Sequence, residues 1–263
     1  MRIERVLANN PGPFTGPGTN TWILDDGSGA AVVIDPGPID ESHSDELLRR
    51  LEGRRPVGVM VTHTHLDHAP MANPLAREMQ VPAIGFAVGP DFEPDIRVDE
   101  GSSIDVGSLD LRVIHTPGHS DDHLCFRVGD VLFTGDHIMG GSSVMVERMG
   151  LYLESLRKLS HTGLERLLPG HGEEMGEPDT VIDWYLEHRR QRHEQIYAAI
   201  AAGAARVSEV VETVYADVSP ALHRLAAVSV AAHVDLLAEE GRIAWDGREL
   251  AVLPPSDPWN LDL

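Results

Sequence analysis

The sequence predicts an α/β domain followed by a small helical domain. Through residue 177, short apolar runs alternate with amphipathic segments, and turn residues such as Asp35-Pro36-Gly37 separate them. Strands that alternate with helices are typical of α/β domains. From Pro178 onward the pattern is almost entirely helical and ends in a short hairpin. We therefore divide the chain into a first domain, residues 1–177, and a second domain, residues 178–263.

The first domain is expected to contain short strands and amphipathic helices. The strands are apolar runs bounded by turn residues, at residues 21–24, 31–35, 57–62, 111–115, 124–128 and 131–134. The helices carry apolar residues at helical spacing, at residues 42–52, 73–79 and 149–159. This order of elements favours a sheet-based core with helices on its faces.

The second domain is expected to contain helices and a hairpin that together resemble a winged helix. The helices are expected at residues 180–202, 207–216 and 220–240, and the strands at residues 242–245 and 249–253. Gly203 and Gly241 follow the first and third helices, where glycine commonly ends a helix. The turn Asp246-Gly247-Arg248 joins the two strands.

Composition limits the classes of function. The 263-residue chain has a formal net charge of −21, which disfavours broad binding to nucleic acid or anionic membranes. Hydrophobic residues make up 42% of it, but no run approaches the roughly 20 apolar residues that span a bilayer. Residues 1–7 carry charges where a signal peptide needs an apolar core, and the single cysteine, Cys125, fits a reducing compartment. These features predict a cytoplasmic protein that does not bind membranes.

A histidine-rich motif follows the apolar run at residues 57–61. It reads His63-Thr64-His65-Leu66-Asp67-His68. Three imidazoles and one carboxylate therefore fall within six residues. Both groups are ligands for zinc and related transition metals. The motif indicates a metal site in the loop that follows a strand.

Three glycine-containing turns each add one further side chain that can bind a metal. These turns are Thr116-Pro117-Gly118-His119-Ser120, Thr134-Gly135-Asp136 and Leu168-Pro169-Gly170-His171-Gly172. Glycine lets the backbone turn tightly beside a ligand. Because this arrangement recurs after three apolar runs, the sequence indicates one shared metal site.

These motifs resemble those of the metallo-β-lactamase superfamily, in order and in residue type, over the first domain. The resemblance implies an αββα sandwich with a two-metal site along one edge. By position, it assigns His63, His65 and His119 to the first metal and Asp67, His68 and His171 to the second, with Asp136 bridging them. It implies two zinc ions per chain, although iron or manganese would also suit this set of ligands.

Longer segments resemble the β-lactamase-like protein 2 group within that superfamily. They are Asn10-Pro11-Gly12-Pro13-Phe14-Thr15, Gly18-Thr19-Asn20-Thr21, and residues 116–123, 151–156 and 188–192. With the winged-helix-like tail included, the resemblance spans nearly the whole chain. That group includes a zinc-dependent endoribonuclease acting on single-stranded RNA, while bacterial relatives are commonly described only as hydrolases.

The sequence departs from that endoribonuclease in ways that matter for the substrate. His137 stands where the endoribonuclease has a cysteine, and residues 220–240 carry Arg224 as their only cation. A recognition helix for DNA would need more positive charge. The tail is therefore expected to form a wall of the active-site cleft or a contact within a homo-oligomer.

The expected reaction is metal-dependent hydrolysis. Two bound cations can share a hydroxide, which acts as the nucleophile, and can stabilise the oxyanion that develops. Asp67 would orient the attacking hydroxide and Asp136 would bridge the metals, so both are expected to be catalytic. His123 and His137 are candidates for a supporting contact behind the ligands or for a general acid.

The substrate prediction has two branches. A small ester, thioester or lactone is favoured by the acidic balance of the chain. Single-stranded RNA is the alternative, favoured by the resemblance and by three arginines that could contact phosphate, Arg189, Arg190 and Arg192.

Other functions rank lower. A glyoxalase II-type thioesterase has a different C-terminal domain, a persulfide dioxygenase uses a single iron with fewer ligands, and class B β-lactamases are exported. A regulator that binds DNA and uses its metals only for structure is disfavoured, because structural zinc sites are usually closed by four ligands and often by thiolates.

Overall fold

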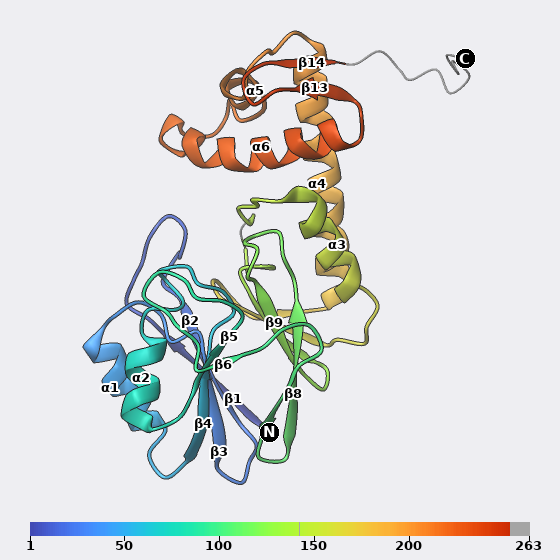
Figure 1. Ribbon diagram of the computed structural model, residues 1–263. Coiled ribbons are helices and arrows are strands. Elements are labelled where there is room, and N and C mark those ends of the chain that lie inside the picture. Colours follow the sequence, from blue (N-terminus) through green and yellow to red (C-terminus); the bar gives the residue numbers. More distant parts are fainter. Residues whose placement is uncertain (142, 253–263) are drawn as a thin grey trace.

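The computed structural model describes residues 1–141 and 143–252. Its first domain contains two six-stranded sheets that stack face to face (Figure 1). The strand order is β1-β2-β3-β4-β5-β6 in the first sheet and β12-β11-β10-β9-β8-β7 in the second. Helices lie on the outer face of each sheet. The architecture is the αββα sandwich that the sequence resemblance implied.

The first sheet is covered on its outer face by two helices. Its strands are β1 (Arg2–Leu7), β2 (Asn20–Asp25), β3 (Ala30–Ile34), β4 (Arg55–Met60), β5 (Ala83–Gly85) and β6 (Ile96–Arg97). The helices are α1 (Glu41–Arg50) and α2 (Ala72–Met79). Leu47 of α1 and Leu75 of α2 are fully buried in one apolar cluster with Val33 and Val59 of the sheet. This cluster holds the helices against β3 and β4.

The second sheet is covered by α3 (Met149–Leu159) and by the start of α4. Its strands are β7 (Ser103–Val106), β8 (Leu109–His115), β9 (Leu124–Val128), β10 (Val131–Gly135), β11 (Arg166–Pro169) and β12 (Met175–Gly176). Tyr152 and Leu156 of α3 pack with Leu132 and Cys125 of the sheet. Cys125 is thus a buried thiol, as its place in an apolar run predicts.

The space between the two sheets is filled by large apolar side chains from both of them. Trp22 and Ile34 of the first sheet and Phe126 and Phe133 of the second belong to one buried cluster. The rings of Trp22 and Phe133 meet edge to face, with 6.2 Å between their centroids. Dense packing of this kind fixes the relative position of the strand ends that carry the candidate ligands.

The second domain is reached through one long helix. Its elements are α4 (Pro178–Ala201), α5 (Val207–Val214), η1 (Pro220–Leu222), α6 (His223–Glu239), β13 (Ile243–Trp245) and β14 (Leu250–Val252). Ile182 of α4 packs with α3, whereas Ile196 and Ile200 pack with α5, α6 and the hairpin. Because α4 contributes to both cores, the division at residue 178 stays a prediction. In Figure 1, α6 lies between the hairpin and the sandwich.

Each helix and strand expected from the sequence is present with small shifts at its ends, and Leu253, the last residue of the expected strand 249–253, lies outside the described residues. The sequence does not predict β1, β5, β6, β7 and β12, and it indicates β11 only as the apolar run before Gly170. β1 carries the charged residues Arg2, Glu4 and Arg5 along a sheet edge, and β6 and β12 contain only two residues each. Such short or polar edge strands lack the apolar signal that strand prediction needs. Within the described part of the chain, no helix has the length and apolar character to cross a membrane.

Acid should destabilise the second domain through His233 of α6. Burial, reinforced by Arg189, lowers the pKa of His233 to about 2. The charged or titratable groups near it are Arg189, Arg192, His188 and His193, and His193 in turn contacts Glu240. Below its unfolded pKa of about 6.5, the unfolded chain binds a proton at this position and the folded chain does not. The contribution of His233 to the free energy of unfolding is therefore highest above pH 6.5 and is lost as the pH falls toward 2.

We expect the free energy of unfolding to fall about 1.4 kcal/mol per pH unit more steeply in the wild type than in His233→Gln, well below pH 6.5. Urea denaturation at pH 6.0, 5.0 and 4.5, with a chelator present throughout, measures this difference. The exposed residue His161 supplies a matched control, His161→Gln. Equal slopes in the wild type and His233→Gln would refute the prediction.

Candidate metal centre

Four loops carry the predicted ligands to one edge of the sandwich. The loop after β4 carries residues 63–68, the loop between β8 and β9 carries His119, and the turns after β10 and β11 carry Asp136 and His171. A Cβ added at Gly170 would lie 2.6 Å from His68 Cε1 and 2.7 Å from Asp136 Oδ1. Only glycine lets the β11 turn approach these side chains so closely.

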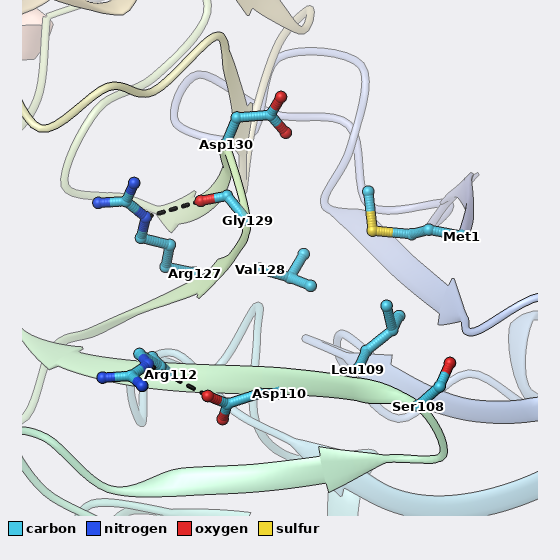
Figure 2. Close-up of a pocket in the computed structure, with 9 residues that line it drawn as sticks. All are labelled: Met1, Ser108, Leu109, Asp110, Arg112, Arg127, Val128, Gly129 and Asp130. Carbon is cyan, nitrogen blue, oxygen red and sulfur yellow. Dashed lines mark hydrogen bonds and ion pairs between the residues drawn. The ribbon is translucent and has the colours of Figure 1, made fainter.

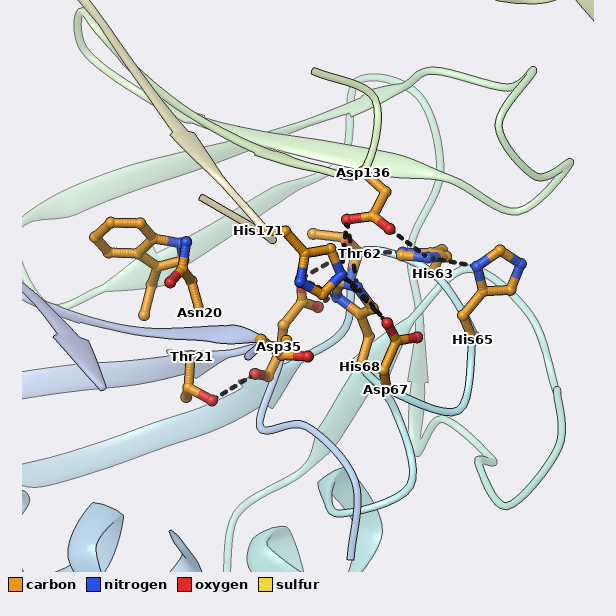
Figure 3. Close-up of polar contacts among 12 residues, drawn as sticks. Asn20, Thr21, Asp35, Thr62, His63, His65, Asp67, His68, Asp136 and His171 are labelled. Carbon is orange, nitrogen blue, oxygen red and sulfur yellow. Dashed lines mark hydrogen bonds and ion pairs between the residues drawn. The ribbon is translucent and has the colours of Figure 1, made fainter. Parts of the chain in front are cut away.

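Three histidines bring their ring nitrogens together in the first cluster. The Nδ1 atom of His65 lies 3.0 Å from His63 Nε2 and 3.1 Å from His119 Nε2. His63 and His119 are buried, and His65 is half-buried. Figure 3 shows His63 and His65 side by side, next to Asp136. Three imidazole nitrogens at these distances can serve as ligands of one metal ion.

The second cluster combines two histidines with two carboxylates. The Nε2 atoms of His68 and His171 lie 3.2 Å apart. Asp67 Oδ2 lies 3.2 Å from His171 Nε2 and 3.8 Å from His68 Nε2. In each cluster, the candidate ligand atoms lie within 4.8 Å of one another, and Asp136 completes the second set.

Asp136 faces both clusters. Its Oδ1 atom lies 3.4 Å from the Nε2 atoms of both His68 and His171. Its Oδ2 atom lies 4.0 Å from His63 Nε2 and 3.8 Å from His119 Nε2. One carboxylate oxygen is therefore directed to each cluster, which is the arrangement that a bridging ligand requires.

The chemistry of the donors fits a cation. Asp136 Oδ1 is buried and has no hydrogen-bond partner among the described residues, and a buried carboxylate oxygen needs a compensating charge. Burial favours the neutral acid, but His68 and His171 outweigh it and hold the pKa of Asp136 well below its usual range. Burial also opposes the charged form of His171, but Asp136 and then Asp67 raise its pKa to about 9. Because imidazole binds metals only when neutral, metal binding competes with protonation of His171.

Asp35, which sequence reasoning treated only as part of a turn, supports the second cluster from behind. Its Oδ2 atom accepts hydrogen bonds from His68 Nδ1 at 3.0 Å and from Thr62 Oγ1 at 2.8 Å, and its Oδ1 atom accepts from Thr62 N at 2.7 Å. The bond to His68 leaves Nε2 of that ring directed at the cluster. The available signal was a carboxylate directly after a buried strand, since Asp35 follows β3 as Asp136 follows β10.

His123 supports the site in the way the sequence analysis allowed. It is fully buried, and its Nε2 atom accepts a hydrogen bond from the backbone N–H of Asp136 at 3.1 Å. Its Nδ1 atom lies 2.9 Å from Thr116 Oγ1, which fixes the orientation of the ring. His123 thus contacts the bridging candidate, and its ring centroid also lies 5.0 Å from that of His63.

The structure encloses His137, the other residue predicted as a supporting contact or a general acid. The side chain is fully buried, and neither ring nitrogen has a hydrogen-bond partner among residues 1–141 and 143–252. Its ring packs edge to face on Tyr152, with 4.9 Å between the centroids. Burial, reinforced by His119 and Lys158, lowers the pKa of His137 to about 3. His137 therefore lies in the core beside Tyr152, and its role as a general acid stays a prediction.

The three arginines on α4 do not form one phosphate-binding surface. Arg189 is 2% exposed and directs a guanidinium N–H to the carbonyl of Val144. Arg190 is exposed and pairs with Glu187, whereas Arg192 lies half-buried over the ring of Tyr215. On a helix, successive residues point about 100° apart, so neighbours in sequence reach different environments. The three side chains therefore lie in different environments, and a phosphate contact by any of them stays a prediction.

A surface hollow of about 740 Å³ lies far from these clusters. Figure 2 shows its lining, which includes Met1, Leu109, Arg127 and Asp130. Residues 129–130 form the turn between β9 and β10, at the opposite end of these strands from His123 and Asp136. The hollow is therefore not an approach to the candidate metal centre.

The comparison with protein families agrees with this geometry. A model described as the metallo-beta-lactamase superfamily matches residues 14–88 and 70–171, a span that contains all seven candidate ligands. The chain belongs to the metallo-beta-lactamase superfamily. A second model, the beta-lactamase associated winged helix domain, matches residues 207–249. The predicted winged helix is thereby confirmed.

Individual relatives cover nearly the whole chain. It is 30% identical to the beta-lactamase-like protein 2 homolog of Drosophila melanogaster, over 92% of this chain and 89% of that protein. It is 32% identical to an atrochrysone carboxyl ACP thioesterase of Aspergillus fumigatus, over 81% of this chain and 73% of that protein. A metallo-beta-lactamase family protein from Thermus thermophilus superposes with a TM-score of 0.80 at 18% identity, over 95% of this chain and 98% of that chain. The chain is thus a superfamily hydrolase with a His and Asp cluster that could bind metal.

Proposed function

We propose that this protein is a two-zinc hydrolase of small acyl thioesters. The observation that carries the proposal is the position of Asp136, whose two oxygens face two separate sets of candidate ligands 3.4 to 4.0 Å away. His63, His65 and His119 would hold one ion, and Asp67, His68 and His171 the other, with Asp136 between them. Bound zinc at such a site supplies an activated water nucleophile and polarises the substrate carbonyl.

The protein side chains would orient the reactants. Asp67 is the more exposed of the two carboxylates, with 28% of its side chain accessible against 9% for Asp136. Asp67 can therefore accept a hydrogen bond from the attacking water, while Asp136 is held by ring nitrogens on both sides. The buried histidines exclude bulk water from one side of the site, which strengthens the electrostatic interactions there.

Space for an acyl group lies beside the ligand loop. A surface hollow of about 760 Å³ has an apolar part, with Ile39, Pro70, Val88 and Phe92. The rest of its lining is largely polar and includes Asn73, Arg77, Asp91, Glu93 and Asp95. Two lining residues connect the hollow to the histidine-rich motif. Pro70 follows the motif in sequence, and Gly89 lies against the side chain of Thr64, so closely that an added Cβ would overlap it. Ile39 and Val88 are 63% and 54% exposed, which is unusual for aliphatic residues and suits contact with an apolar substrate.

Two observations favour the thioester over RNA. One relative at 32% identity is named as a thioesterase, which supports a thioester among the small acyl substrates. The formal net charge of −21 opposes a polyanion, and the arginines expected to contact phosphate do not share one surface.

Turnover of a substrate panel tests the proposal. We expect zinc-loaded protein to release free thiol from acetyl, butyryl and hexanoyl thioesters, with kcat/KM rising with acyl length as the chain fills the hollow. A chelator should abolish the release, and added zinc should restore it. Lactone, simple ester and labelled single-stranded RNA complete the panel.

The outcomes are distinct. Cleavage of RNA without thioester hydrolysis would replace the proposal with the nuclease alternative. Absence of turnover on every thioester by protein that holds its metal would also contradict it. Ile39→Asp offers a check on the hollow, because it should raise KM for the hexanoyl thioester more than for the acetyl thioester.

A further inference from the structure

We propose that Arg189 of the second domain is a positioning residue of the metal centre, acting through the backbone of residues 144–146 on the ring of His119. The inference rests on the metal site of the proposed function but concerns a contact between domains that the proposal does not need. It assigns a role to the link between the winged-helix domain and the catalytic domain.

The ring of His119 is oriented by the backbone of Met145. The Nδ1 atom of His119 donates a hydrogen bond to the backbone carbonyl of Met145 at 2.7 Å. This contact fixes the tautomer, so that Nε2 is the atom left facing His65 and Asp136. A backbone carbonyl or carboxylate in this position typically sets both the orientation and the basicity of a metal-binding histidine.

Residues 144–146 are in turn contacted by side chains of α4 and α6. Val144 and Val146 are buried, and Met145 between them is half-buried. The carbonyl of Val144 accepts a hydrogen bond from Arg189 of α4, and the N–H of Val146 lies 3.5 Å from Ser229 Oγ of α6. The peptide groups on both sides of Met145 are therefore held by helices of the second domain.

The buried position of Arg189 is unfavourable for stability. Arg189 is 2% exposed, no carboxylate within the described ranges pairs with it, and its Nε atom has no hydrogen-bond partner there. Its guanidinium lies 5.3 Å from the ring centroid of Tyr152, within the range of a cation–π contact, but Tyr152 carries no compensating negative charge. A buried and incompletely paired cation is unfavourable for stability. The stability of the fold therefore does not explain why an arginine stands at this position, whereas its hydrogen bond to the Val144 carbonyl does.

The metal affinity of full-length variants tests the proposal. Cobalt(II) competed against a chromophoric chelator gives a dissociation constant without any substrate. Arg189→Met keeps the aliphatic packing and removes the guanidinium, and we expect it to weaken cobalt binding at least about tenfold, the usual effect of losing such a supporting contact. The matched control is Arg190→Met on the next position of α4, which should bind cobalt as the wild type does. Equal affinity in Arg189→Met and the wild type overturns the proposal.

A double-mutant cycle separates positioning from a general loss of structure. If Arg189 acts through His119, then Arg189→Met should change the cobalt affinity less than about twofold in the background of His119→Ala. The same loss in both backgrounds would show that Arg189 does not act through this ring and would overturn the proposal. Should Arg189→Met fail to fold, Arg189→Lys takes its place, with an expected loss of about threefold because one ammonium replaces the planar fork. Wild-type affinity in that variant likewise overturns it.

The result is independent of the substrate. If the protein hydrolyses no thioester but shows the expected cobalt affinities, the proposed function is contradicted and the role of Arg189 is supported. If the protein hydrolyses thioesters but Arg189→Met binds cobalt as well as the wild type does, the proposed function is supported and the role of Arg189 is contradicted.

Discussion

Replacement of Asp136 by alanine is expected to reduce metal-dependent hydrolysis by about a thousandfold or more in kcat/KM, since a single group that stabilises the developing charge commonly contributes that much. Asp136 contacts ring nitrogens of both clusters, so its loss removes one donor from each. We also expect the metal content per chain to fall, as measured by elemental analysis after dialysis. Steady-state kinetics on the best thioester of the panel gives the rate.

Asp110→Ala is the matched control for this experiment. Asp110 is an exposed carboxylate near the start of β8, paired with Arg112 and distant from the ligand loops. It should keep wild-type turnover and metal content. Retention of more than a tenth of the wild-type rate by Asp136→Ala would contradict the bridging role.

The grouping of the candidate ligands could be predicted because each of them is part of a short local pattern. Residues 63–68 supply four side chains in one loop, and His119, Asp136 and His171 each stand beside a glycine after an apolar run. Each of these loops follows a strand, and the strands end at the same edge of the sandwich. Ligands that follow different strands are therefore expected to lie close together in space. The resemblance to a known superfamily then assigned the two groups.

The supporting residues could not be predicted because their roles depend on contacts distant in sequence. The bond between Arg189 and Val144 joins residues 45 positions apart, and that between His68 and Asp35 joins residues 33 apart. The burial of His137 follows from α3 packing over it, which its position beside Asp136 does not reveal. Three arginines close together in sequence suggested a surface, but a helix divides neighbours among core, edge and solvent.

Asp35→Ala should cause the largest loss of stability of any single substitution considered. Asp35 is 1% exposed and accepts three hydrogen bonds, from Thr62 N, Thr62 Oγ1 and His68 Nδ1. Removal of the carboxylate leaves these donors buried and unpaired, which costs about 3–5 kcal/mol in the free energy of unfolding. Urea denaturation in the presence of a chelator measures this loss, and cobalt competition should show at least about tenfold weaker binding because His68 loses its orientation.

Asp35→Asn distinguishes the hydrogen bonds from the backbone at this position. Asp35 has φ of 52°, in the left-handed region that asparagine tolerates and alanine does not. Asparagine keeps one acceptor oxygen but places an N–H₂ group where Asp35 now accepts a bond, so we expect a loss of about 1–3 kcal/mol, smaller than that of alanine. If both variants were as stable as the wild type, the bonds behind His68 would be dispensable. If asparagine preserved stability but still weakened cobalt binding, then orientation of His68 would be the main role of Asp35 and backbone conformation the lesser one.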